Sequence, residues 1–600
     1  MIAEASEPMT KSTAKVTTSP RLWREVASRA LRGFWVRGKL ATRSVGALRL
    51  PKAPHPHPLP ASPGERAESS LPSRAADSPG RARQHQEALI HQCLPPRIHQ
   101  FLPPRIRPRS ATRALITGGL LALLALAPAA CETIPDYPNR PLAAGSSNPP
   151  PADLIGADPG APLILIAFSG GGSRAAALGL GVLDELAAQS YPATGKPVAL
   201  IDRVKVVSSV SGGSVVAAWF GLVGPARLDE LKSDFLARDN MATLERDAAD
   251  PLTLARLSFS SYTRIDALRD LLDRELFHGA RFADLRRPGA PLVVMNASDM
   301  ESGEVFAFTP QRFDDLCSDL DQLPLSVAVA ASAAFPVALS PMSLRNYSYE
   351  ECKGPIPGGG WIAAELTLPL PRYINLEEYK RARYANALRN GKDAYRNEHY
   401  LHLLDGGLVD NQGVQSLTEV LVSPRSPARI LEAINSGRTR RIVVIAVNAR
   451  ADADNGVGGN PAVPGLLKVV NTVIGAPIDS TTARSNASLQ NLVDTLKAAG
   501  ASTVRAPGQP LFAGLRVYNI SVDFDQFLPE QHQLQIAVKN IGTSWSLSPT
   551  QLQEAIEAGR ILLRQHPCFQ RLLLDLNVQP APAEPTIVRN SCRFKDDKIS

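Results

Sequence analysis

Three short stretches of small residues hold the side chains of this 600-residue chain that are best suited to chemistry. The first is SGGGSR, from Ser169 to Arg174; the second is SVSGGS, around Ser211; the third is LLDGG, in which Asp405 precedes two glycines. A serine hydroxyl is a weak nucleophile until a neighbouring group takes its proton. A carboxylate in a site of low polarity, where its pKa is raised, can take that proton. The residue types therefore fit acyl transfer.

Ser211 occupies a turn between two apolar segments, VKVV before it and VVAAWF after it. This order of strand, tight turn and helix is typical of a nucleophile elbow, in which the residues two before and two after the serine must be small. Ser209 and Gly213 meet that requirement, although Ser209 stands where a glycine is usual. Ser208, Ser209 and Ser214 are less well placed candidates for the same role.

Gly170, Gly171 and Gly172 lie between the apolar run PLILIAF and a helical pattern. Successive glycines let backbone N–H groups converge at a helix N-terminus, where they can bind a phosphate or an oxyanion. The segment lacks the Lys-Ser/Thr pair of a P-loop and the spacing of a dinucleotide-binding loop. Two interpretations remain, an oxyanion-binding loop and a purely structural turn.

The motif Asp405-Gly406-Gly407 follows an apolar stretch, and it has an ordinary alternative because Asp-Gly is a common turn dipeptide. His402 lies close to it in sequence and could complete an unconventional Ser-His-Asp triad. We interpret His402 instead as a structural histidine. In that interpretation Asp405 alone serves the nucleophile as base and then as acid.

Three apolar runs predict the strands that position these motifs. PLILIAF at residues 162–168 is typical of a strand buried on both faces of a parallel sheet. The segment at residues 204–223 begins with another apolar strand pattern, followed by a turn of small residues and an apolar helix. RRIVVIAVNAR at residues 440–450 predicts another strand after the aspartate motif. Each of the first two runs is followed by a loop of small residues and a helical pattern.

The order of glycine loop, serine turn and Asp-Gly-Gly motif resembles that of the patatin-like phospholipases. The resemblance extends to LFHGARFADL from Leu276, PLVVMNASDMESGEVFAFTP from Pro291 and LSVAVAASAAFPVALSPM from Leu325, and it covers residues 162–447. It implies a three-layer α/β/α domain with a mainly parallel central sheet, which we place at residues 162–450. It also implies a Ser-Asp dyad instead of a triad.

Carried over by motif, the resemblance implies that Ser211 is the nucleophile, that Asp405 is the base and that the loop Gly170–Gly172 is the oxyanion hole. Arg174 occupies the basic position that follows these glycines in the family. Ala175 stands where the family often has another glycine, which affects the fine geometry and not the assignment. Supporting roles fall to Gly213, Gly406 and Gly407.

Residues 1–113 are rich in Pro, Arg, Ser and Ala, and they show no helix or strand period. Such a composition cannot bury enough apolar surface to fold, so we interpret this prefix as disordered or as lying upstream of the true start. The net charge of +8 is concentrated before Cys131, whereas the remainder of the chain is slightly acidic. Charge therefore does not support a nucleic-acid partner.

Residues 114–130, ALITGGLLALLALAPAA, are uncharged, follow several arginines and precede Cys131. This pattern is typical of a signal peptide, and AAC resembles the end of a bacterial lipobox. We expect export to the cell envelope and a lipid anchor at Cys131 that holds the protein at a membrane surface. The alternatives are a short transmembrane or core helix, and cleavage after APA at residues 127–129 to give an unanchored product.

Export would place the cysteines that follow Cys131 in the sequence in an oxidising compartment. Cys317, Cys352, Cys568 and Cys592 allow three pairings or four free thiols. The pairs Cys317–Cys352 and Cys568–Cys592 close the shorter loops. No Cys/His cluster suggests a metal ion, and no cofactor is expected.

Three further regions differ from the predicted domain in composition. Residues 131–161 are rich in Pro, Gly and Ser and predict a tether. Residues 345–400 hold most of the 11 tyrosines, and Asn375 with Glu378 predicts a capping box that opens a helix. This insertion is either a lid at a lipid surface or a segment packed on the domain, and we favour the second. Residues 451–600 predict helices and loops that cover the core.

With 44% apolar, 20% charged and 6% aromatic residues and a mean hydropathy of −0.08, the chain is expected to be a globule and not a polytopic membrane protein. Motifs and resemblance together predict an acyl-ester hydrolase that acts on phospholipid or a related lipid. The alternatives are an esterase or thioesterase for soluble acyl groups, and a non-catalytic lipid-binding lipoprotein. The head group, acyl position, chain length, choice of inner or outer membrane and oligomeric state do not follow from the sequence.

Overall fold

The computed structural model divides the chain into two units, residues 1–131 and residues 132–600. All described residues belong to the second unit, so the predictions for residues 1–113, for residues 114–130 and for Cys131 lie outside them. The structure describes residues 137–156, 158–193, 195–336, 338–348, 359–367, 376–390, 399–423, 426, 428–451, 465–500, 514–579 and 591–594.

An eight-stranded mixed sheet forms the centre of this unit, in the order β12-β11-β2-β5-β6-β10-β9, with β7 paired to β6. β12, β11, β2, β5 and β6 run parallel, whereas β7, β9 and β10 are antiparallel to their neighbours. The predicted α/β fold with a mainly parallel sheet is thereby confirmed. The strands are β2 (Pro162–Phe168), β5 (Val204–Val210), β6 (Leu292–Asp299), β7 (Val305–Ala307), β9 (Met342–Arg345), β10 (Tyr400–Asp405), β11 (Arg441–Asn448) and β12 (Arg516–Asp523).

The central strand β2 forms where the sequence is apolar without interruption. All 7 residues of β2 are buried. Ile164 and Ile166 belong to one hydrophobic core, and Leu163 and Leu165 belong to a second one. Because successive side chains of a strand point to opposite faces, the sheet has a core on each side.

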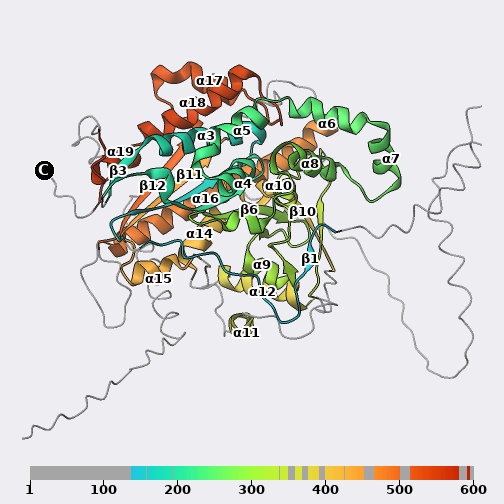
Figure 1. Cartoon of the computed structure of the whole chain (residues 1–600), viewed down its shortest axis with the longest axis horizontal. Helices are drawn as coiled ribbons and strands as arrows, with labels where there is room; N and C mark the ends of the chain where they lie inside the picture. Colours follow the sequence, from blue (N-terminus) through green and yellow to red (C-terminus); the bar gives the residue numbers. More distant parts are fainter. Residues whose placement is uncertain are drawn as a thin grey trace, which may run out of the picture. The chain divides into compact units, whose positions relative to one another are not determined.

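Helices cover both faces and complete three layers (Figure 1). The first core is packed against α3 (Gly172–Ala188), α4 (Gly212–Val223), α10 (Leu325–Ser332) and α18 (Pro549–Gln565). The second core is packed against α14 (Val414–Val422), α15 (Ile430–Asn435) and α16 (Leu466–Gly500). The predicted three-layer α/β/α arrangement follows from these two cores.

The remaining short strands pair outside the main sheet, β1 (Arg140–Pro141) with β8 (Ser318–Asp319) and β3 (Ser190–Pro192) with β4 (Pro197–Ala199). Within the described part of the chain, none of the helices is both long and apolar enough to cross a membrane. The other helices are α5 (Leu228–Leu231), α6 (Asn240–Ala249), α7 (Pro251–Phe259), α8 (Arg264–Leu272), α9 (Pro310–Asp315), α11 (Gly360–Leu366), α12 (Leu376–Asn390), α13 (Gly407–Asp410), α17 (His532–Lys539) and α19 (Pro567–Asp575).

The chain after residue 450 contributes a strand as well as helices. β12 pairs in parallel with β11 at the edge of the sheet, a strand that the sequence analysis did not predict. α18 crosses α3 at a point where both helices carry a glycine. A Cβ on Gly181 would overlap the Ile556 carbonyl, and a Cβ on Gly559 would overlap the Leu178 carbonyl. The two glycines therefore allow the close approach that holds α18 on the core.

The tyrosine-rich insertion is described only in part, and Asn375 of the expected capping box lies outside the described residues. α12 buries Tyr384 and Leu388. At its last turn, Arg389 forms an ion pair with Asp315 of α9 at 2.5 Å. These contacts place the described helix against the body of the domain, as expected of a packed insertion.

A disulfide joins Cys568, in the first turn of α19, to Cys592. This is the local pairing considered from the sequence. Cys317 is also disulfide-bonded, and Cys352 lies outside the described residues. A cross-link over 24 residues restricts the unfolded chain and so stabilises the folded one by about 3 kcal/mol.

Replacing Cys568 and Cys592 together by alanine is expected to lower the free energy of unfolding by about 3 kcal/mol, because the unfolded chain regains its freedom. Urea unfolding of the variant and the wild type in an oxidising buffer measures this difference. Equal midpoints and equal slopes would contradict a stabilising disulfide at this place.

Candidate active site

Ser211 lies in a strained turn between β5 and α4, with a φ of 51° and a ψ of −123°. A positive φ is unfavourable for a residue with a side chain, so the surrounding packing must hold the turn. The next two residues must be small. A Cβ on Gly212 would overlap the Gly172 carbonyl, and a Cβ on Gly213 would lie 2.6 Å from the Ser169 carbonyl oxygen. The turn therefore sets Ser211 directly beside the glycine loop.

Ser209, which stands where a glycine is usual, fits the turn because its hydroxyl is hydrogen-bonded. Ser209 Oγ donates to the Val294 carbonyl at 3.4 Å and accepts from Ser214 Oγ at 3.1 Å. Ser208 Oγ donates to the Gly413 carbonyl at 2.6 Å. The three alternative serines are fully buried and engaged in internal hydrogen bonds. Ser211 is thus the serine of this segment that the turn presents to Asp405.

Asp405 is the last residue of β10, and both its backbone N–H and its backbone carbonyl are hydrogen-bonded. Its N–H donates to the Ala334 carbonyl at 3.0 Å, and its carbonyl accepts from Ser298 Oγ at 2.8 Å. Its carboxylate accepts the Gly407 N–H at 2.7 Å. A Cβ on Gly406 would overlap the Asn296 carbonyl, so a larger residue could not follow the aspartate here. The predicted supporting glycines therefore shape the aspartate turn.

The carboxyl of Asp405 is buried and lies beside Ser211. Burial raises its pKa to about 6, while the Gly407 N–H and the Ser211 side chain each favour the charged form and lower it. A carboxylate with such a pKa is mostly ionised at neutral pH and remains more basic than an exposed one. The geometry thus brings together the predicted nucleophile and the predicted base.

The glycine loop lies beside Ser211, but its three amides differ in whether they are already hydrogen-bonded. The Gly170 N–H donates to the Asn411 carbonyl at 2.9 Å, so this amide is already used. Gly171 and Gly172 have φ values of 138° and 60°, which favour glycine. Their N–H groups have no acceptor among the described residues. Of the three predicted oxyanion-hole glycines, Gly171 and Gly172 therefore have the available amides.

Arg174 is buried behind the glycine loop. Its Nε donates to the Ala449 carbonyl at 2.8 Å, and its Nη1 donates to the Ile541 carbonyl. Burial lowers its pKa to about 10, which still leaves it charged at neutral pH. No carboxylate pairs with it in the described part of the chain. Its charge adds a positive potential at the loop that would favour a developing oxyanion.

His402 lies on the opposite face of β10 from Asp405, since the two are three residues apart and side chains alternate along a strand. His402 is exposed, and its Nδ1 is 2.8 Å from Ser343 Oγ. The structure therefore does not bring His402 into a triad with Ser211 and Asp405.

Asn296 in β6 is a buried residue of the site that the sequence analysis missed. Its side-chain nitrogen donates to Ser208 Oγ at 2.9 Å and to the Ser209 carbonyl at 3.0 Å, and its Oδ1 accepts from Ser416 Oγ at 2.6 Å. Its carbonyl accepts from Ser332 Oγ at 2.6 Å. Asn296 thus ties the strand before the nucleophile to α10 and α14.

Ser332 of α10 connects the serine turn with the aspartate turn. Its Oγ accepts the Ser211 N–H at 2.8 Å, and its carbonyl accepts the Gly406 N–H at 3.1 Å. One residue therefore fixes the backbone of the serine turn and that of the aspartate turn. In the sequence Ser332 is one small residue among many, and only its position in the fold identifies it.

Asn411 holds the glycine loop in place beside the aspartate turn. Its carbonyl accepts the Gly170 N–H, and its Oδ1 lies 2.7 Å from the position of a Cβ on Gly170 and 2.9 Å from that of a Cβ on Gly407. It therefore fills the space between the two glycine motifs. The sequence DGGLVDNQG contains the residue, but nothing in its type distinguishes it from a turn asparagine.

Replacing Ser332 by alanine is expected to lower kcat about 10- to 100-fold with little change in KM, because the Ser211 N–H loses its acceptor and the serine turn loosens. Steady-state hydrolysis of a p-nitrophenyl ester measures both constants. The matched control is Ser326→Ala, a buried serine of the same helix whose Oγ donates to Asp273 at 3.3 Å. Equal effects of the two substitutions would show that Ser332 acts only through general stability.

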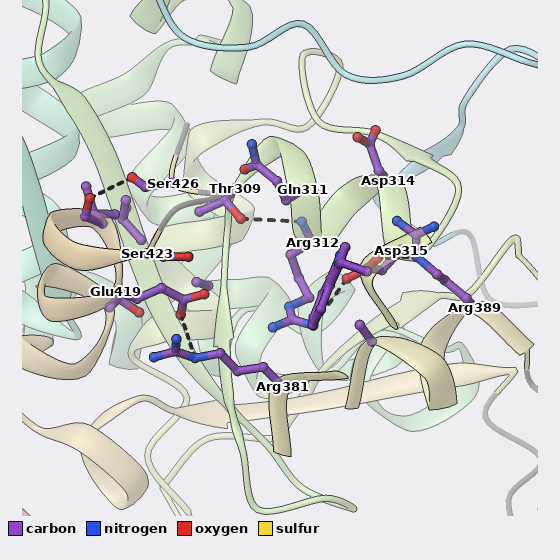
Figure 2. A pocket seen from close by; sticks show the side chains of 16 residues that line it. Thr309, Gln311, Arg312, Asp314, Asp315, Arg381, Arg389, Glu419, Ser423 and Ser426 are labelled. Carbon is purple, nitrogen blue, oxygen red and sulfur yellow. Dashed lines mark hydrogen bonds and ion pairs between the residues drawn. The ribbon is translucent and has the colours of Figure 1, made fainter. Parts of the chain in front are cut away.

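A separate cavity of about 150 Å³ lies on the α14 side of β6 (Figure 2). Two ion pairs lie in its wall, Arg381 with Glu419 at 3.6 Å and Arg389 with Asp315 at 2.5 Å. Neither Ser211 nor Asp405 lines it. The described residues also contain no group of three His, Cys, Asp or Glu side chains that could hold a metal ion.

The fold and the site define an α/β protein in which a serine turn, a buried aspartate and a glycine loop meet. The family model for patatin-like phospholipases matches residues 166–418, a span that contains Ser211, Asp405 and the glycine loop. Over these residues the chain is similar to the patatin-like phospholipases.

Solved structures that are similar to this chain include human GIVD cytosolic phospholipase A2, alone and in complex with methyl gamma-linolenyl fluorophosphonate. The first shows 13% identity and a TM-score of 0.34 over 70% of this chain and 62% of that chain. The second shows 12% identity and a TM-score of 0.32 over 70% and 59%. The match thus spans less than two thirds of the human enzyme. Comparison with curated protein sequences finds no match.

Proposed function

We propose that this protein hydrolyses acyl esters of phospholipid or a related lipid, with Ser211 as nucleophile and Asp405 as the only general base. The observation that carries the proposal is the placement of Ser211, on a strained turn, next to a buried carboxyl whose pKa is raised to about 6. The match of residues 166–418 to the patatin-like phospholipase family model supports a lipid substrate.

In the first half-reaction Ser211 Oγ attacks the acyl carbonyl while Asp405 accepts its proton. The carbonyl oxygen becomes an oxyanion, which the N–H groups of Gly171 and Gly172 stabilise as fixed dipoles. When the C–O bond of the ester breaks, Asp405 returns the proton to the leaving alcohol. An acyl group is then bonded to Ser211 Oγ, and the carboxylate of Asp405 is regenerated.

In the second half-reaction Asp405 removes a proton from water, and the resulting hydroxide attacks the acyl carbonyl. The bond to Ser211 Oγ breaks, Ser211 takes the proton back, and a free fatty acid leaves. The same carboxyl acts as base and acid in both halves. A pKa above that of an exposed aspartate and below neutral pH suits both roles.

The experiment that tests the proposal is incubation of the full chain with mixed phospholipid vesicles and with p-nitrophenyl acyl esters of increasing length. Release of fatty acid and lysophospholipid from vesicles is the expected result. Hydrolysis restricted to soluble esters or thioesters would favour the esterase alternative. Vesicle binding without hydrolysis of any substrate would favour a lipid-binding protein.

We further propose that the protein is exported and carries a lipid on Cys131, so that it acts at a membrane surface of the cell envelope. The uncharged run before Cys131 supports export. The disulfide Cys568–Cys592 supports it as well, since structural disulfides persist in oxidising compartments.

The lipid anchor predicts that Cys131→Ala releases the protein from the membrane fraction and abolishes incorporation of labelled fatty acid. Both are measured after fractionation of the cells that produce it. Unlabelled wild-type protein in the soluble fraction would contradict the anchor and agree with cleavage after residues 127–129.

A further inference from the structure

The α6–α7 arm, residues 240–259, projects beside the body of the domain (Figure 1). It exposes large apolar side chains. Asn240 is its one buried helical residue, and α7 has none. Leu252 is 71% exposed and Phe259 is 61% exposed. Apolar side chains of this size that gather on one exposed element mark a surface that another apolar phase covers.

The two most exposed residues of α7 form one face. Leu252 and Phe259 are seven residues apart, which places them on the same side of a helix, with Arg256 beside them. Arg256 is the only ionisable residue within α7, and its guanidinium stacks over the Tyr262 ring at 4.0 Å. The face thus combines two apolar anchors with one cation and no carboxylate.

The arm begins at the rim of the catalytic site. The Met241 N–H donates to Ser546 Oγ at 2.8 Å. Two residues earlier, the Ser544 carbonyl accepts the Ser173 N–H at 2.8 Å and lies so close to Gly172 that a Cβ there would overlap it. The first turn of α6 is therefore one short segment, residues 544–546, away from the oxyanion-binding glycines.

We propose that the α6–α7 arm docks the protein on a phospholipid surface, with Leu252 and Phe259 entering the acyl layer and Arg256 meeting the phosphates. The choice of a lipid surface as partner rests on the proposed function. A hydrolase of membrane lipids must hold its site against the bilayer, and an exposed helix with an apolar face and a flanking cation binds in the plane of such an interface.

The location of the arm separates this partner from a second copy of the chain. A contact between copies could cover Leu252 equally well, but it would not explain why the arm starts beside the glycine loop. A lipid surface places the apolar anchors and the catalytic rim against the phase that contains the substrate. Self-association is nevertheless measured in the test.

The test is cosedimentation of the full chain with vesicles of phosphatidylcholine and phosphatidylglycerol. All proteins carry Cys131→Ser, so that no acyl group at that residue contributes. Leu252→Ser/Phe259→Ser is compared with the wild-type arm. The control is Ile536→Ser on α17, a 42% exposed apolar residue of an element that Figure 1 shows well apart from α7.

The double substitution is expected to weaken vesicle binding at least about tenfold, because two apolar side chains no longer enter the bilayer. Ile536→Ser is expected to bind like the parent, and equal unfolding midpoints show that the variants are folded. Parent-like binding by the double variant, or no binding by the parent, would overturn the proposal. So would a loss of self-association with vesicle binding unchanged.

A result that contradicts the proposed hydrolase function can be distinguished from one that contradicts membrane docking by the α6–α7 arm. Hydrolysis of a soluble p-nitrophenyl ester is measured on the parent alone. Its absence would remove the catalytic proposal, whereas the vesicle-binding difference would still decide the role of Leu252 and Phe259.

Discussion

Ser211→Ala is expected to lower ester hydrolysis at least about 10⁴-fold, because no other oxygen reaches the acyl carbonyl from the serine turn. Ser211 is held at a φ of 51° by Gly212, Gly213 and the acceptor Ser332 Oγ, so the variant loses its nucleophile and keeps its turn. Alanine has no stricter backbone requirement than serine here, and the fold should be unaffected. Initial rates at saturating ester measure the loss.

The control for this variant is Ser214→Ala, three residues further along the same segment. Among the described residues, the hydrogen-bond partners of Ser214 Oγ are Ser209 Oγ and Ser332 Oγ, at 3.1 and 3.0 Å. Its replacement should leave a rate within about tenfold of the wild type, since one hydrogen bond of the supporting network is lost. A larger loss in Ser214→Ala than in Ser211→Ala would transfer the nucleophile to Ser214.

Asp405→Asn is expected to lower kcat about 10³- to 10⁴-fold, because an amide cannot take the proton of Ser211 Oγ. The same substitution should not destabilise the protein. The raised pKa of Asp405 means that ionisation of its buried carboxyl costs folding free energy above pH 6, up to about 3 kcal/mol. Asparagine removes that cost and can still accept the Gly407 N–H, so urea unfolding at pH 8 should show equal or greater stability.

The sign of the pH dependence follows from the same shift. Asp405 must be deprotonated to act as base, and burial raises its pKa to about 6, so kcat/KM should rise with pH and level off above that value. Stability should run the other way, falling as pH rises from about 4 to 6, because the folded state holds the proton more strongly than the unfolded state. A rate profile with its midpoint near 4 would contradict a desolvated base.

The central strands and the catalytic motifs could be predicted because local pattern determines them. The run at residues 162–168 is apolar throughout and forms β2 with those bounds. The predicted strand that begins at Val204 forms as β5. The glycines of the serine turn and of the aspartate turn are required by close approach of backbone atoms, which their spacing in the sequence already indicates.

The remaining parts of the site depend on contacts between distant segments. Asn296 and Ser332 are 36 residues apart and are joined only when α10 folds over β6. β12 pairs with β11 across the long helix α16, and its mixed pattern of apolar and polar residues gives no strong strand signal by itself. The engagement of the Gly170 amide by Asn411 likewise becomes visible only in three dimensions.

The exposed face of α7 could not be predicted from the sequence pattern. PLTLARLSF has the composition of an ordinary amphipathic helix, and the sequence alone would place its leucines in the core. In the structure the helix lies outside both hydrophobic cores. The neighbouring helix α8, by contrast, contributes Ile265, Leu268 and Leu271 to the first core.

The most direct measurement of the dyad is mass-spectrometric mapping of the residue that reacts with an alkyl fluorophosphonate, which phosphonylates an activated serine with loss of fluoride. The account predicts a single modified peptide carrying the adduct on Ser211. It also predicts that labelling slows strongly in Asp405→Asn and disappears in Ser211→Ala. An adduct on another serine in an active enzyme, or labelling of Ser211 at an unchanged rate in Asp405→Asn, would contradict the Ser211–Asp405 dyad.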